Sequence, residues 1–243
     1  MTLSKKELEI FNRDGFLLLR GFLAKEETQK ILEVAQKEMV LKNEPIESEG
    51  EYLEDSSRED TLRRLRQVYQ RDKVFSNWMK NPEIKPILNQ VLGEAPIITL
   101  AHHNSIMTKM PNNLSSQTDW HQDIRYWHFN GDNLVSVWLA LDYEHKDNGV
   151  LEFIPESHKR EFGKESFDEK LYFLDNDINR KLIDKRVSFE LNSGDVVLFH
   201  AKTLHRADPN HTDKPKISFV YTVRGETTTP IKGTRSDAQE IKL

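Results

Sequence analysis

Hydrophobic residues along the chain follow two patterns, and the change between them falls near residue 96. Before that point they recur at the spacing of an amphipathic helix, as Leu32, Ala35 and Met39 do. Ser4 with Glu7 forms a capping-box pattern, which is typical of a helix start. These patterns predict a mostly helical N-terminal third: helices over 4–11, 25–40, 61–81 and 82–93, with a buried strand over 15–19.

After residue 96 the chain consists of short runs of β-branched and aromatic residues. Turn sequences separate the runs, and two of them, 146–149 and 192–195, place Asn or Ser before Gly. Regularly spaced short strands predict a β-sandwich or barrel. The predicted strands are 97–100, 106–109, 135–141, 149–154, 186–191, 196–200 and 217–223.

The segment 42–60 differs from its surroundings, because it carries many carboxylates and few aliphatic residues. This composition predicts a solvated loop on the surface, and it is compatible with a lid over a pocket.

Composition limits the kinds of site that the chain can form. The 243 residues include no cysteine, which excludes disulfides, thiolate zinc sites, iron–sulfur clusters and cysteine nucleophiles. Any metal must therefore be held by histidine and carboxylate. A net charge of -5 gives no broad cationic field, so no nucleic-acid partner is expected. The polar N-terminus and the lack of a ~20-residue apolar run predict a cytoplasmic protein without membrane contact.

The sequence Trp120-His121-Gln122-Asp123 is the strongest chemical signal. On a β-strand, side chains two residues apart leave the same face, so His121 and Asp123 can bind one metal. The pair is predicted near the start of a strand at the rim of the β domain. A chance His-x-Asp triplet in a chain with nine histidines is the competing explanation.

A second imidazole is needed to complete a facial set of two histidines and one carboxylate. His205 follows the turn and buried strand of 192–200, about where a late strand of a jelly roll folds back against the first pair. His200 and His211 are alternatives, but His200 ends an apolar run and His211 lies in a polar loop. We therefore predict His121, Asp123 and His205 as metal ligands.

Ordered motifs lie at 11–16, 120–123, 138–142, 148–151, 155–159, 194–200, His205 and 209–210. Together they resemble the phytanoyl-CoA dioxygenase family of Fe(II)/2-oxoglutarate oxygenases. Glu156 departs from the family pattern, since it replaces the usual glycine of a Pro-Gly-Ser-His turn. The resemblance covers most of the chain.

The resemblance implies a mainly β fold with flanking α-helices, built on a double-stranded β-helix (jelly roll, cupin-like). It implies one oxygenase domain over 1–243, with a helical part over about 1–95, a jelly-roll core over about 96–225 and a tail over 226–243. His121, Asp123 and His205 would bind Fe(II), and 2-oxoglutarate and O₂ would be co-substrates. The carboxylate of Asp123 favours hydroxylation, because relatives that halogenate lack it.

The family usually binds the distal carboxylate of 2-oxoglutarate with an arginine eleven residues after the second histidine. Here that position is Lys216, a point charge without the two-pronged guanidinium. Ser218 would face the same way on a strand and share the carboxylate, unless Lys216 points to water. The resemblance also implies cofactor-binding roles for Trp138, Met107 and Arg66.

The substrate is least determined by the sequence. Arg125 and Trp127 follow the first metal pair, and His103 precedes a strand that would line the same cavity, so all three are candidates for binding a small, polar or anionic molecule. Three alternatives to a hydroxylase stay open: desaturation, cyclisation or epimerisation with the same cofactors; a non-catalytic metal-binding ligand binder or sensor; and a cupin-type enzyme without a keto acid. The sequence gives no signal of oligomeric state.

Overall fold

Two antiparallel sheets carry the fold in the computed structural model, which describes residues 1–243. The six helices are α1 (Lys5–Asp14), α2 (Lys25–Leu41), α3 (Glu49–Leu53), α4 (Lys73–Met79), α5 (Lys85–Leu92) and α6 (Asp177–Ile183). The strands are β1 (Phe16–Leu19), β2 (Ile46–Ser48), β3 (Leu62–Arg66), β4 (Pro96–Lys109), β5 (Thr118–His121), β6 (Leu134–Ala140), β7 (Leu151–Phe153), β8 (Val187–Ser188), β9 (Val196–His200), β10 (His205–Ala207), β11 (Lys216–Gly225) and β12 (Glu240–Lys242).

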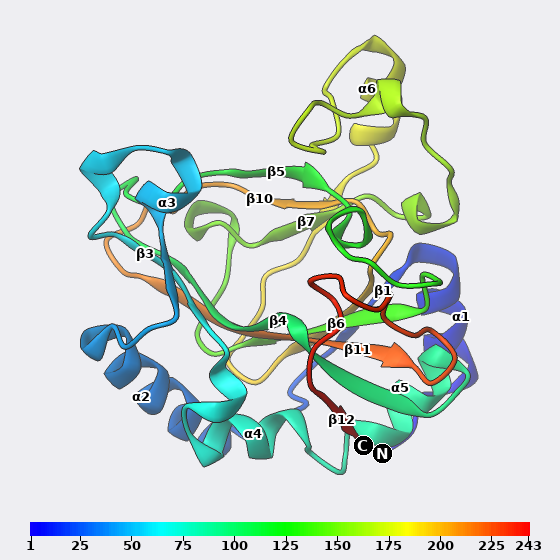
Figure 1. Ribbon diagram of the computed structural model, residues 1–243, viewed down its shortest axis with the longest axis horizontal. Helices are drawn as coiled ribbons and strands as arrows, with labels where there is room; N and C mark the ends of the chain where they lie inside the picture. Colours follow the sequence, from blue (N-terminus) through cyan, green and yellow to red (C-terminus); the bar gives the residue numbers. More distant parts are fainter.

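The larger sheet has the order β1-β9-β6-β11-β4-β3-β2, with β12 also paired to β4, and the smaller sheet has the order β5-β10-β7-β8. Most neighbouring strands are distant in sequence, so the chain passes repeatedly from one sheet to the other. The smaller sheet lies above the larger one in Figure 1, and α6 projects beyond it. This arrangement confirms the predicted double-stranded β-helix.

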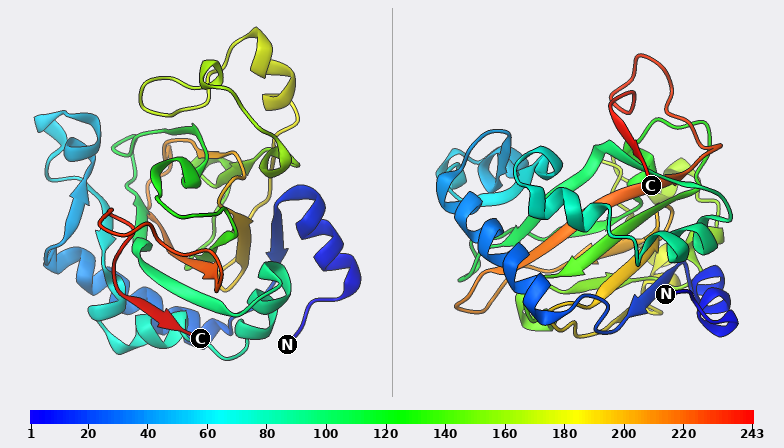
Figure 2. Two further views of the ribbon diagram at one scale, coloured as in Figure 1. Left: turned by 45° about the vertical axis from the view of Figure 1, so that its right-hand side comes forward. Right: turned by 90° about the horizontal axis from the view of Figure 1, so that it is seen from below.

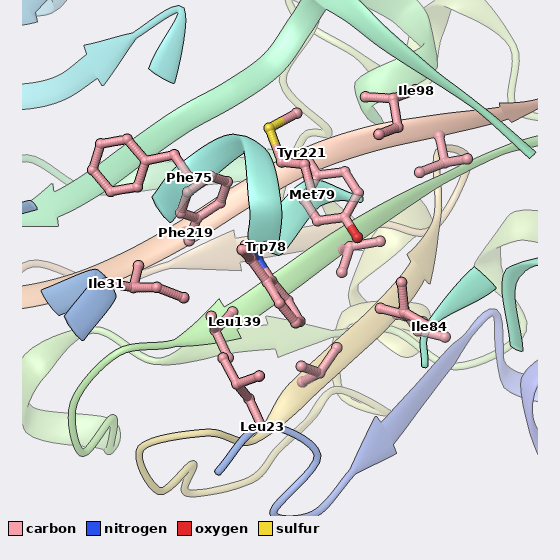
Figure 3. Close-up of a cluster of buried hydrophobic side chains, with 14 of the residues drawn as sticks. Leu23, Ile31, Phe75, Trp78, Met79, Ile84, Ile98, Leu139, Phe219 and Tyr221 are labelled. Atoms are coloured by element: carbon pink, nitrogen blue, oxygen red, sulfur yellow. The ribbon is translucent and has the colours of Figure 1, made fainter. Parts of the chain in front are cut away.

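Helices α2, α4 and α5 cover the outer face of the larger sheet, and seen from below they lie across its strands (Figure 2, right). Alternation along β11 separates the two faces: Phe219 and Tyr221 point to the helices, whereas Lys216 and Val220 line the space between the sheets. Figure 3 shows Phe75, Trp78 and Met79 of α4 packed against the helix-facing side chains of β11. No helix is long and apolar enough to cross a bilayer.

The first helix begins as its sequence predicts, but it runs to Asp14 and so ends three residues after the predicted end at Phe11. The Ser4 side chain accepts from the Glu7 backbone, while the Glu7 side chain accepts from the Ser4 backbone. Gly15 ends the helix in the left-handed region, with φ 84°, and an added Cβ there would lie 2.4 Å from the ring of His158. Glycine thus allows α1 to turn directly into β1.

The helix predicted over 61–81 is wrong for its first part, because 62–66 forms β3 and pairs with β4. Pairing with β4 on one side and β2 on the other supplies the backbone hydrogen bonds that a local helix would otherwise make. The two strands predicted over 97–100 and 106–109 are one long strand, β4, which carries a register shift opposite Tyr221 and Thr222. The segment 226–243, expected as a tail, returns to this sheet through β12.

The solvated loop predicted over 42–60 is also wrong in part, because the segment contains β2 and α3. Glu47 and Glu49 are 6% and 0% exposed, and both lie at ion-pair distance from Arg63. Buried carboxylates require such cations, which here come from β3. Some carboxylates of this segment therefore belong to a buried charge cluster, and the others lie on the surface.

Phe219 is fully buried, and its ring contacts those of Phe75 and Tyr221. We expect Phe219→Ala to lower the free energy of unfolding by about 3–5 kcal/mol, because it leaves a cavity in a close-packed core. Ile178→Ala, at a position 78% exposed on α6, is the control and should change this quantity by less than about 0.5 kcal/mol. Urea denaturation measures both variants, and equal effects would contradict the described packing.

Candidate metal centre

Strand pairing brings the two predicted histidine ligands together. His205 of β10 is the register partner of His121 of β5, and their ring centroids are 4.2 Å apart. Asp123 does not continue β5, because the strand ends at His121 and Asp123 opens the 3-10 turn Asp123–Tyr126. One ligand atom from each of the three residues lies within 4.8 Å of the others. The predicted position at the start of a strand is therefore wrong, but the predicted proximity is confirmed.

Backbone carbonyls fix the orientation of both imidazoles. His121 Nδ1 lies 2.8 Å from the Asp119 carbonyl oxygen, and His205 Nδ1 lies 3.0 Å from that of Thr203. A carbonyl can only accept, so each Nδ1 carries the proton and each Nε2 presents a lone pair. The two Nε2 atoms lie 3.6 and 3.8 Å from Asp123 Oδ1. This donor set fits a divalent metal such as Fe(II).

Asp123 supplies the negative charge of the site. Ser136 Oγ donates to its Oδ2 at 3.3 Å, which leaves Oδ1 toward the imidazoles. Burial alone would raise the pKa of Asp123, but the imidazoles of His103 and His205 hold this pKa well below the usual carboxyl range. Burial lowers the pKa of His205 to about 4, with a further contribution from His121. At neutral pH the centre therefore combines a carboxylate with a neutral His205.

A cavity of about 630 Å³ opens at these three side chains and lies between the two sheets. Of the expected cofactor-binding residues, Met107, Trp138 and Lys216 line this cavity. Arg66 lines it as well, but it lies on β3 instead of a helix and pairs with Glu47. Ser218 is fully buried behind the cavity wall.

The carboxylate of Glu144 contacts three of the expected cofactor-binding residues, which the sequence did not predict. Its Oε1 accepts from Ser218 Oγ at 2.7 Å and from Trp138 Nε1 at 3.0 Å, while Oε2 lies 3.3 Å from Lys216 Nζ. Lys216 also donates to the Gly149 carbonyl at 2.7 Å. Lys216 thus does not point to water, and a side-chain carboxylate of the protein takes its charge.

Two of the three candidate substrate residues face the cavity. His103 Nε2 approaches Asp123 Oδ1 to 3.1 Å without the angle of a directed hydrogen bond, and Trp127 packs edge-on to His103. Arg125 does not line the cavity; it donates to the Gln122 side chain, and its guanidinium stacks on a phenylalanine ring outside. The position of Arg125 argues against the substrate role that its sequence neighbours suggested.

The alternative histidines lie elsewhere. His200 accepts from the Lys202 backbone and packs against His158, outside the cavity. His211 contacts Asn113 in a surface loop. Neither belongs to the cluster of possible ligands.

Sequence reasoning missed Lys109 and Glu144. Lys109 stands two residues after Met107 on β4, so strand alternation would have placed both on the cavity face. Glu144 lies in a loop after β6 and carries no periodic signal. Only the fold brings its carboxylate to β11.

Comparison with known proteins shows one family over most of the chain. The model of the phytanoyl-CoA dioxygenase (PhyH) family matches residues 11–218. A probable phytanoyl-CoA dioxygenase of Caenorhabditis elegans is 24% identical over 226 residues, which are 87% of this chain and 72% of the relative. A probable alpha-ketoglutarate-dependent hypophosphite dioxygenase of Stutzerimonas stutzeri is 29% identical over 207 residues, 82% of this chain and 70% of the relative.

Solved structures share the fold at low identity. EctD from S. alaskensis with 2-oxoglutarate and 5-hydroxyectoine superposes with a TM-score of 0.78 at 17% identity, covering 94% of this chain and 78% of EctD. The epimerase SnoN in complex with Fe³⁺, alpha-ketoglutarate and nogalamycin RO superposes with a TM-score of 0.76 at 18% identity. The match covers 98% of this chain and 94% of SnoN. The jelly-roll architecture is therefore common to enzymes with different reactions.

We expect His205→Ala to weaken binding of Fe(II), or of Co(II) as a stable probe, by more than about 100-fold, because it removes a ligand atom. Ser136→Ala removes only a partner of Asp123 and should weaken binding by about 10-fold. Anaerobic calorimetric titration measures both. His200→Ala is the matched control outside the cavity, and a loss of metal affinity there equal to that of His205→Ala would contradict the assignment.

Proposed function

The chain belongs to the phytanoyl-CoA dioxygenase family, and from this premise we propose that it is an Fe(II)- and 2-oxoglutarate-dependent dioxygenase that hydroxylates a C–H bond of a small molecule. The convergence of His121, Asp123 and His205 on one point at the cavity carries this proposal. Two imidazoles and one carboxylate leave half of an octahedral coordination sphere for other ligands.

His121, Asp123 and His205 would hold the metal. Bound there, iron with 2-oxoglutarate supplies the oxidation of a C–H bond by O₂, with release of succinate and CO₂. The backbone contacts of both histidines keep each Nε2 directed to the metal position before any metal binds. The Asp123 carboxylate occupies a position that a halide would need, which supports hydroxylation over halogenation.

The cavity wall orients the substrate. His103 offers an imidazole close to Asp123, and Trp127 offers a flat aromatic surface that also stacks on His102, with centroids 4.8 Å apart. We propose that a polar group of the substrate contacts His103 while its carbon skeleton lies against Trp127. The cavity volume of about 630 Å³ is in the usual range of small-molecule sites.

We expect the purified protein with Fe(II), ascorbate and 2-oxoglutarate to release succinate, and Asp123→Ala to abolish this release by removing the charged ligand. A panel of small polar metabolites under ¹⁸O₂ should contain one compound that accelerates succinate release and gains one labelled oxygen atom, as measured by mass spectrometry. A product that has lost two hydrogens and gained no oxygen would indicate desaturation or cyclisation instead of hydroxylation. A product of unchanged mass would indicate epimerisation, and no succinate with any compound would indicate a binding protein.

For the substrate found in this way, we expect His103→Ala to raise KM by about 10-fold, since one polar contact is lost. Metal affinity should fall by no more than about 10-fold, as in Ser136→Ala, because His103 neighbours Asp123 but all three ligands remain. Arg125→Ala is the control, because Arg125 lies outside the cavity. Substrate KM and cobalt affinity together check the assignment. A substrate KM that rises in Arg125→Ala but not in His103→Ala would assign the substrate contact to Arg125 instead of His103.

A further inference from the structure

The donors expected to bind the distal carboxylate of 2-oxoglutarate already bind a carboxylate of the protein. Glu144 is fully buried and accepts from Ser218 and Trp138, and its other oxygen faces Lys216. A second carboxylate at Lys216 would have to approach the first one in a buried region, where like charges repel strongly. Glu144 therefore neutralises the cation at the usual family position.

The cavity contains other cations, and most of them are also neutralised. Four arginines that line it have a carboxylate oxygen at ion-pair distance: Arg63, Arg64, Arg66 and Arg206. Arg235 has no such partner, but it is exposed. Lys109 is the one buried cation of the cavity lining without a carboxylate partner; it is 6% exposed.

The contacts of Lys109 Nζ are backbone carbonyls, and none is a carboxylate. Its Nζ donates to two backbone carbonyls, that of Ser116 at 2.5 Å and that of Ala207 at 3.3 Å. Burial, with the nearby charges of Arg63 and Lys216, lowers the pKa of Lys109 to about 7. A carboxylate in contact with Nζ would stabilise the ammonium form and complete its set of hydrogen bonds.

Strand pairing relates Lys109 to the metal ligand His205. Ala207, whose carbonyl it contacts, is two residues after His205 on β10, which corresponds to about 7 Å along a strand. Lys109 is the register partner of Lys216, so the two ammonium groups come from adjacent positions on β4 and β11. A five-carbon keto acid with one end at His205 can therefore direct its other end to β4.

We infer that Lys109 binds the distal carboxylate of 2-oxoglutarate, and that Lys216 with Glu144 forms a neutral part of the cavity wall. This inference rests on the proposed function, because it assigns the anchor of the proposed co-substrate. It names a co-substrate-binding residue that the family pattern does not indicate, since the sequence signal there points to Lys216.

The test compares 2-oxoglutarate with 2-oxopentanoate, which has the same chain but a methyl group in place of the distal carboxylate. Calorimetric titration of the anaerobic Fe(II)-loaded protein gives a dissociation constant for each. We expect the wild-type protein to prefer 2-oxoglutarate by about 10- to 100-fold, the value of a charged hydrogen-bonded contact. In Lys109→Met this preference should fall to about 1-fold, and Lys109→Arg should keep most of it.

Two further variants make the test decisive. Lys109→Gln can still donate to the Ser116 and Ala207 carbonyls without a charge, so it reports on the anchor if Lys109→Met does not fold. The double variant Glu144→Gln with Lys216→Met removes the ion pair between these two residues without leaving a buried unpaired charge. It should keep the wild-type preference for 2-oxoglutarate over 2-oxopentanoate. Cobalt affinity should be the same in all of these proteins.

Each outcome separates the two proposals. A preference that survives in the uncharged Lys109 variants overturns the assignment. A preference that collapses in the double variant alone also overturns it and makes Lys216 the anchor. A wild-type protein that binds Fe(II) but neither keto acid contradicts the proposed function itself. A wild-type protein that binds both keto acids equally overturns the anchor alone, because the keto-acid end then carries all of the affinity.

Discussion

The pairing of β10 with β5 is the constraint on which the rest of the site depends. It places His205 directly opposite His121, so two residues more than eighty positions apart become cross-strand neighbours with ring centroids 4.2 Å apart. Because side chains alternate along a strand, a slip of one residue would turn His205 away from its partner. The turn that begins at Asp123 then brings the carboxylate to the same point.

Internal ion pairs shape the cavity behind this centre. Glu47 and Glu49 bind Arg63, and Glu144 binds Lys216, in each case with the carboxylate almost fully buried. Removing such charges from water is costly, and the cost is offset only when each charge finds partners of good geometry. These pairs fix the walls between the two sheets and limit which cations remain available to a ligand.

The sequence predicted local features well where they depend on neighbouring residues. The capping box at Ser4 determines the start of α1, because its hydrogen bonds are made within a few residues. It failed for β3 and for the long β4, whose backbone groups are satisfied by strands from other parts of the chain. Local propensity carries no information about such partners.

The same division holds for the site. The sequence by itself determined the ligand types, since the absence of cysteine and the His-x-Asp motif left histidine and carboxylate as the metal-binding groups, and it singled out His205 over its alternatives. Only the tertiary structure decided which charges are free: it sent Arg125 out of the cavity, paired Lys216 with Glu144 and left Lys109 without a carboxylate. Charge pairing depends on distances across the sheets, and residue order along the chain does not specify these distances.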